Sequence, residues 1–171
     1  AGGALWVASL GEIGYKGNFF KAEITVLKTS FNGSAAGSLG GAVAVMDQSN
    51  VSFVATQFYR CTAHESGGAV SVVRGANASL LQCHFERNIA HGVGGGAVHS
   101  ISSRTRLEGN IFILNKAEAG GGGALLWEGI MPIIITSCAP GFEVAQSLGS
   151  QNRTDCYPCI AGTYSFPPVV S

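Results

Sequence analysis

Charged residues are scarce in this sequence, and they carry no net charge. They make up 12% of the 171 residues, with 10 Lys and Arg against 10 Asp and Glu. This share is about half that of an ordinary soluble domain. The basic surface of a nucleic-acid-binding protein is therefore missing. We expect no nucleic-acid partner, whereas a neutral surface favours association between copies of the chain.

Long hydrophobic runs are also missing. No stretch of 18 apolar residues occurs, so we predict no membrane insertion of this segment. The longest apolar burst, at 130–135, is short and contains Pro132. No charged segment followed by an apolar one stands at the start, so no signal peptide is visible. We interpret the chain as a mature or partial segment of a longer precursor.

A repeat of 27 residues is the dominant feature that is present. Phenylalanine recurs at this constant step, at Phe31, Phe58, Phe85 and Phe112. An alanine stands five positions after each Phe, and a Gly-Gly-Ala-(Val/Leu) block follows. Short β-branched and aromatic runs fill the space between glycines, for example at 42–45 and 51–54, and they are typical of strands. Internal repetition of this kind indicates a stacked repeat architecture.

We predict an all-β fold, a right-handed parallel β-helix of about four to five coils. Each 27-residue repeat would be one coil with two or three strands, and parallel crossovers are strongly right-handed. Coils stack about 4.8 Å apart, so equivalent residues form ladders. The four Phe side chains would form an internal aromatic stack. Asn88 and Asn115, three positions after their Phe, would form an amide ladder that also bonds the turn backbone.

The repeat motif is complete in two copies. Phe-x-x-Asn-x-Ala followed by Gly-Gly-Ala occurs at 85–97 and 112–124, whereas Ser34 and Cys61 occupy the Asn position in the first two copies. Over about residues 1–130 the pattern resembles the repeats of polymorphic outer membrane proteins and related β-helical surface proteins. This resemblance implies a parallel β-helix of pectin-lyase-like architecture.

The C-terminal segment has a different composition. Cys138-Ala-Pro-Gly, then Cys156-Tyr-Pro-Cys159 and Gly-Thr-Tyr-Ser, are similar to the ephrin-receptor-like cysteine-rich repeat. This resemblance implies a small extracellular disulfide module in which Cys138 pairs with Cys156 and Cys159 has its partner outside the chain or none. We therefore divide the chain into a β-helix at 1–136 and this module with an extended tail at 137–171. A zinc site is the competing interpretation of Cys-x-x-Cys.

The remaining cysteines, Cys61 and Cys83, occupy different positions of the repeat. Their offset along a strand is about 16 Å, which is too long for a disulfide. We expect both to be buried free thiols.

Four Asn-x-Ser/Thr sequons predict N-glycosylation, and together with the cysteine module they favour a secreted or cell-surface protein. Two of them share one repeat position, eight residues before a Phe, where we expect a surface turn. The alternative, unused sequons in a bacterial protein, stays open. The four acceptors are Asn32, Asn50, Asn77 and Asn152.

Clustered carboxylates, which polysaccharide cleavage and calcium binding need, are missing. Asp occurs only at Asp47 and Asp155, in different segments. His91 and His99 flank a glycine turn and are the candidate metal pair, yet we expect no metal, no cofactor and no enzymatic activity.

We therefore expect a structural extracellular glycoprotein, a rigid β-helical segment of a cell-surface, cell-wall or appendage assembly. Its partners would be copies of itself, neighbouring surface proteins, attached glycans and polysaccharide. The first alternative is a carbohydrate- or receptor-binding adhesin, using the loop at 11–18 or aromatic residues such as Trp6, Tyr15 and Trp127. The second is a polysaccharide lyase or hydrolase.

Overall fold

The computed structural model describes residues 3–8, 23–130, 133–135, 142–147 and 152–158. The predictions for the loop at 11–18, for Tyr15 and for Cys138 and Cys159 lie outside these residues. No helix within the described ranges is long and apolar enough to cross a bilayer.

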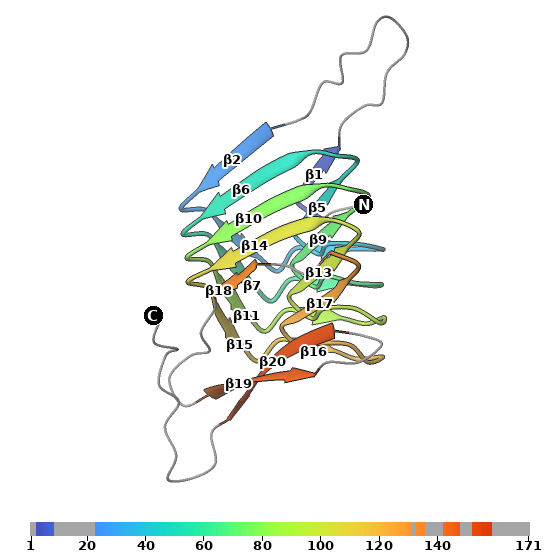
Figure 1. The fold of residues 1–171 in the computed structure, drawn as a ribbon, viewed down its shortest axis with the longest axis vertical. Coiled ribbons are helices and arrows are strands. Elements are labelled where there is room, and N and C mark those ends of the chain that lie inside the picture. Colours follow the sequence, from blue (N-terminus) through green and yellow to red (C-terminus); the bar gives the residue numbers. More distant parts are fainter. Residues whose placement is uncertain (1–2, 9–22, 131–132, 136–141, 148–151, 159–171) are drawn as a thin grey trace, which may run out of the picture.

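The described residues form an all-β parallel solenoid of about four coils with a period of 27 residues, and they include no helix (Figure 1). The predicted fold class is confirmed, while the handedness stays a prediction. Each coil has four strands instead of the expected two or three, because the alanine column forms a fourth strand of only two residues. The strands of the first two coils are β1 (Leu5–Ala8), β2 (Glu23–Leu27), β3 (Ser30–Asn32), β4 (Ala35–Ala36), β5 (Val43–Met46), β6 (Asn50–Val54), β7 (Gln57–Tyr59) and β8 (Thr62–Ala63).

The later coils repeat this order. The third and fourth coils contain β9 (Val70–Val73), β10 (Asn77–Leu81), β11 (His84–Glu86), β12 (Ile89–Ala90), β13 (Val98–Ile101), β14 (Arg104–Glu108), β15 (Ile111–Ile113) and β16 (Lys116–Ala117). A partial fifth coil has β17 (Leu125–Glu128) and β18 (Ile133–Ile135), and an antiparallel hairpin of β19 (Phe142–Ser147) and β20 (Asn152–Pro158) follows.

Equivalent strands of successive coils pair in parallel and build four sheets. Sheet A runs β1-β5-β9-β13-β17-β20-β19, sheet B runs β18-β14-β10-β6-β2, sheet C runs β15-β11-β7-β3, and sheet D runs β16-β12-β8-β4. Figure 1 shows the strands of sheet B as a regular stack along the long axis of the molecule. The register places each residue directly over its repeat equivalent, so that Phe85 pairs with both Phe58 and Phe112.

The four Phe rings form a continuous stack in the core. Consecutive ring centroids from Phe31 to Phe112 are 5.2, 4.8 and 4.8 Å apart, and the rings are within 8° of parallel. Phe58 and Phe85 are completely buried, whereas Phe31 at the first coil is only partly buried. Offset stacking of this kind adds about 0.5–1.5 kcal/mol per pair to the burial of each ring.

The corners on either side of sheet C use the left-handed backbone conformation. Ala55 and Gln82 adopt positive φ before β7 and β11, and Arg60 and Arg87 adopt it after them. Gly109 adopts the same conformation before β15 (Ile111–Ile113), but most of these corners carry residues other than glycine. This conformation costs a non-glycine residue about 1–2 kcal/mol. We therefore expect the side chain of the following residue to stabilise the corner.

The second glycine of each Gly-Gly-Ala block is required by the close approach of successive coils. A Cβ atom on Gly68 would lie 2.0 Å from the carbonyl oxygen of Gly96, and one on Gly41 would lie 2.0 Å from that of Gly68. These contacts are backbone atoms that cannot move aside. The block is therefore a steric consequence of coil stacking rather than a ligand-binding loop.

The hairpin continues sheet A beyond the parallel coils. Strand β20 pairs antiparallel with β17, the last parallel strand of the sheet, and β19 pairs with β20. An uncovered edge is prone to unwanted strand pairing, and here the edge of β17 is occupied. The hairpin belongs to the segment that we assigned to the cysteine-rich module, so the boundary near 136 stays a prediction.

Candidate functional site

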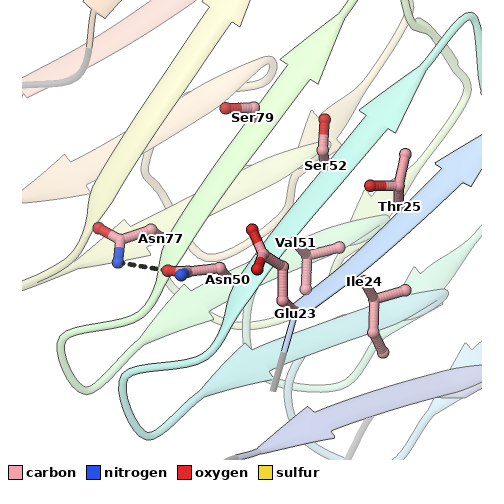
Figure 2. Close-up of a pocket in the computed structure, with 8 residues that line it drawn as sticks. All are labelled: Glu23, Ile24, Thr25, Asn50, Val51, Ser52, Asn77 and Ser79. Atoms are coloured by element: carbon pink, nitrogen blue, oxygen red, sulfur yellow. Dashed lines mark hydrogen bonds between the residues drawn. The ribbon is translucent and has the colours of Figure 1, made fainter. Parts of the chain in front are cut away.

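A shallow groove on the outer face of sheet B is the main candidate site. It has a volume of about 210 Å³ and crosses β2, β6 and β10 (Figure 2). We call it the sheet B groove. Its lining consists of Glu23, Ile24, Thr25, Asn50, Val51, Ser52, Asn77 and Ser79.

Strand alternation combined with coil stacking arranges the outer face into three strips. The first, third and fifth residues of β2, β6 and β10 point outward, whereas the second and fourth, such as Ile24 and Val26 of β2, pack against the core. Equivalent outward residues are in register from coil to coil. The amide strip is Glu23, Asn50 and Asn77; the hydroxyl strip is Thr25, Ser52 and Ser79; the aliphatic strip is Leu27, Val54 and Leu81.

The polar groups of the groove are only partly satisfied. Asn77 Nδ2 donates a hydrogen bond to Asn50 Oδ1 at 2.7 Å, the dashed contact in Figure 2. No hydrogen bond of the three hydroxyl-strip side chains occurs within the described part of the chain. With no bond to the described residues, the hydroxyl strip offers donors and acceptors to a ligand or to water.

The next coil changes the chemistry of the same face. Arg104 and Arg106 follow the amide and hydroxyl strips on β14. Arg106 Nη2 lies 2.6 Å from Glu108 Oε2, so its charge is paired. The groove thus lies over three coils and has a charged boundary at β14.

The predicted glycosylation acceptors lie in different settings. Asn50 and Asn77 are the partly buried first residues of β6 and β10, inside the groove, and not in the surface turn that we expected. Asn32 is exposed at the end of β3. Asn152 begins β20, and its side chain lies outside the description. Glycan attachment at all four stays a prediction.

Asn88 and Asn115 form an internal amide ladder. The fully buried Asn88 donates from Nδ2 to Asn115 Oδ1 at 2.9 Å and to the Phe58 carbonyl at 3.0 Å. Its Oδ1 accepts the backbone N–H of Cys61 at 2.9 Å, and Asn115 Nδ2 donates to the Phe85 carbonyl at 3.0 Å. Asn88 thus links its own coil to the coils before and after it, and Asn115 links its coil to the preceding one. Each side chain lies at a corner that follows a left-handed residue.

A second column of this kind was missed by sequence reasoning. Asn110 is completely buried, accepts the backbone N–H of Cys83 at 2.7 Å and donates to the Leu80 carbonyl at 2.7 Å. It stands two residues before Phe112, just after the left-handed Gly109. The signal was weak, because the column contains only one Asn.

Cys61 and Cys83 are free, buried thiols, as predicted. They occupy the positions of Asn88 and Asn110 one coil earlier, and each Sγ lies 3.6 Å from a carbonyl oxygen of the preceding coil. Burial is the main cause that raises the pKa of both thiols. A protonated thiol can accept a backbone N–H and contact a carbonyl, so cysteine replaces the amide in these columns.

A buried serine and histidine meet beneath the glycine-rich turn over sheet A. Ser66 Oγ lies 2.7 Å from His99 Nδ1, and each residue is 3% exposed. Burial lowers the pKa of His99 to about 4, so the ring is neutral at pH 7. Neighbouring Ser71 is buried, and its Oγ has no hydrogen-bond partner within the described residues. The pair is closed to a substrate and anchors the turn to the sheet.

His91 and His99, the candidate metal pair, have separate roles. The exposed His91 Nδ1 lies 2.7 Å from Glu118 Oε2, and Lys116 donates to the other oxygen at 3.1 Å. These hydrogen bonds lower the pKa of Glu118. Among the described residues, no group of three or more His, Cys, Asp or Glu is placed to hold a metal ion.

The two described tryptophans differ from each other. Trp127 is 3% exposed and belongs to the core, so it is not available as the stacking platform of the adhesin alternative. Trp6 is 54% exposed, and its Nε1 lies 3.2 Å from Met46 Sδ.

No family model, curated protein or solved structure matches this chain. The resemblances noted for the repeat and for the cysteine-rich segment therefore stay predictions.

Proposed function

We propose that this chain is a rigid structural segment of an extracellular surface or appendage assembly. The observation that carries the proposal is the unbroken, in-register stack of coils, joined by backbone ladders and by the Phe and Asn columns inside. A repeat of this kind contacts mainly its neighbours along one axis. Stretching or bending such a rod requires several hydrogen-bond ladders to break together, which suits a load-bearing or spacing role.

The extracellular location rests on the four sequons and on the cysteine pattern near the C-terminus. Intact and peptide mass spectrometry of protein purified from its native source tests it. We expect a glycan on the exposed Asn32 and a disulfide between Cys138 and Cys156. Unmodified sequons together with free thiols at both cysteines would contradict this location.

Assembly rests on the low content of charged residues and the zero net charge of the chain, which provide little repulsion between copies. Negative-stain electron microscopy over a range of protein concentrations tests it, and we expect arrays or filaments at high concentration. Leu114→Glu is a useful comparison, because this exposed side chain can accept a charge without disturbing the core. Dispersed monomers alone, at every concentration, would remove the assembly from the proposal.

A further inference from the structure

We propose that the sheet B groove is a binding site for a neutral glycan chain that lies along the coil axis across β2, β6 and β10. The inference goes beyond a structural role, and it stands whether or not the rods assemble. It rests on the lining of the groove, on the free hydroxyl groups and on the adjoining aliphatic strip.

The hydroxyl strip offers repeated, unpaired hydrogen-bonding groups. Thr25, Ser52 and Ser79 are one coil apart, and no hydrogen bond ties their hydroxyls within the described residues. Each hydroxyl is both a donor and an acceptor, as is each hydroxyl of a sugar. A linear glycan can therefore make one contact per coil, at the strand spacing of about 4.8 Å.

The amide strip sets one side of this path. Asn50 and Asn77 are linked by their 2.7 Å hydrogen bond, which fixes the orientation of both amides. Fixed amides lose less side-chain entropy when they bind a ligand than mobile ones do. Glu23 extends the strip at the first coil and adds an acceptor for sugar hydroxyls.

The aliphatic strip sets the other side. Val54 and Leu81 are partly buried, and Leu27 is 60% exposed. A pyranose ring has an apolar face of C–H groups and a rim of hydroxyls. A surface with an aliphatic strip beside a hydroxyl strip matches that amphipathic shape, as small-molecule sites combine apolar area with a few polar groups.

The charge of the groove selects a neutral chain. Its lining contains the carboxylate of Glu23 and no cationic side chain. A phosphate or a uronic acid would meet the like charge of Glu23 here. On the next coil Arg106 is paired with Glu108, and Arg104 follows Asn77 at the boundary of the groove, outside its lining.

The size of the groove indicates a weak site. Its volume of about 210 Å³ is below the roughly 300–1,000 Å³ of sites that enclose a drug-sized ligand. It can hold a short stretch of a chain while the remainder stays in solvent. We expect a dissociation constant of about a millimolar for an oligosaccharide.

Nuclear magnetic resonance titration of the full 171-residue chain tests the proposal. The protein is produced in a bacterial periplasm, which allows disulfides and leaves the sequons bare. The probes are cello-, laminari- and manno-oligosaccharides, with oligogalacturonate as the acidic comparison. We expect at least one neutral probe to shift the backbone amides of β2, β6 and β10, and the acidic probe to bind more weakly.

Matched variants locate the site. Ser52→Tyr places a ring over the middle of the hydroxyl strip and is expected to weaken binding about tenfold or more. Ser30→Tyr is the control, because it makes the same change at an exposed, outward position on sheet C. Thr25→Tyr provides a second blocking variant should Ser52→Tyr fail to fold. The control variant should bind as the original chain does.

Five results would overturn the proposal, four of them concerning the glycan probes and the variants. The first two are the absence of shifts with any neutral probe at millimolar concentration, and shifts confined to other strands. The next two are binding by both blocking variants that is as tight as that of the original chain, and tighter binding of the acidic probe than of the neutral probes. Shifts that follow protein concentration instead of glycan concentration would assign the face to a second copy of the chain, and would also overturn it.

Discussion

Replacing Asn88 by alanine tests whether internal amides hold the solenoid corners. The side chain makes three hydrogen bonds of 2.9–3.0 Å to Cys61 N–H, the Phe58 carbonyl and Asn115 Oδ1. Alanine leaves the first two backbone groups buried without these partners, and each such group costs about 1–3 kcal/mol. We therefore expect Asn88→Ala to lower the free energy of unfolding by about 4 kcal/mol.

Asn88→Cys is the matched comparison. In the preceding coil Cys61 occupies the equivalent position and contacts the Phe31 carbonyl at 3.6 Å. A cysteine at 88 can reach the same backbone groups through longer, weaker contacts. We expect a loss of about 1–2 kcal/mol for this variant, clearly smaller than that for alanine.

Urea denaturation followed by far-ultraviolet circular dichroism measures the free energy of unfolding of both variants. The slope of this free energy against urea concentration is compared with that of the original chain. Because a repeat structure can unfold in parts, hydrogen exchange of the Cys61 amide is measured alongside. Exchange should be fastest in Asn88→Ala. Equal losses for the two variants, or a loss below about 0.5 kcal/mol for alanine, would refute the assignment of corner stability to the amide ladder.

Three further predictions follow from burial. Phe85→Ala should cost about 3–5 kcal/mol, more than Phe31→Ala, since Phe85 is fully buried and stacked on both sides; equal losses in thermal or urea denaturation would argue against the stack. His99 has a pKa of about 4 in the folded chain and 6.5 when unfolded, so its contribution is complete above pH 6.5 and about 3 kcal/mol is lost as the pH falls to 4; His99→Gln should flatten that part of the stability profile, and an unchanged profile would contradict the burial argument. Ser71→Ala should stabilise the chain by about 1 kcal/mol, because its buried hydroxyl makes no hydrogen bond with the described residues and Ala44 fills the equivalent position one coil earlier; a destabilised variant would show that the hydroxyl is satisfied.

The sequence was most informative where the period places like residues in one column. The Phe column and the Asn88–Asn115 pair could be predicted because stacking makes each residue the neighbour of its repeat equivalent. The Gly-Gly-Ala block was visible in the sequence as a repeat, and the structure supplies its reason, because the coils approach too closely there for a Cβ. Contacts between successive coils restrict which residues fit at these positions, so the same residue types recur in each repeat.

Other features have no repeated signal. The two-residue strands, such as β8, are too short for any periodicity to reveal them. The Ser66–His99 pair joins a turn and a strand that lie at different points of the coil, so no column links the two residues. The sheet B groove depends on three adjacent strips whose members differ from coil to coil. Asn50 and Asn77 did share a column, but the sequence did not show that they begin strands.

Contacts between phenylalanine rings provide the most direct test of the central claim, that residues 27 apart lie over one another. Nuclear Overhauser spectra of protein with labelled phenylalanine measure them. The coil stack predicts cross-peaks between the rings of Phe58 and Phe85 and between those of Phe85 and Phe112, whose centroids are 4.8 Å apart in each pair. It predicts none between Phe58 and Phe112, which are separated by a full coil. Missing contacts between consecutive rings, or a direct contact between Phe58 and Phe112, would contradict the stack.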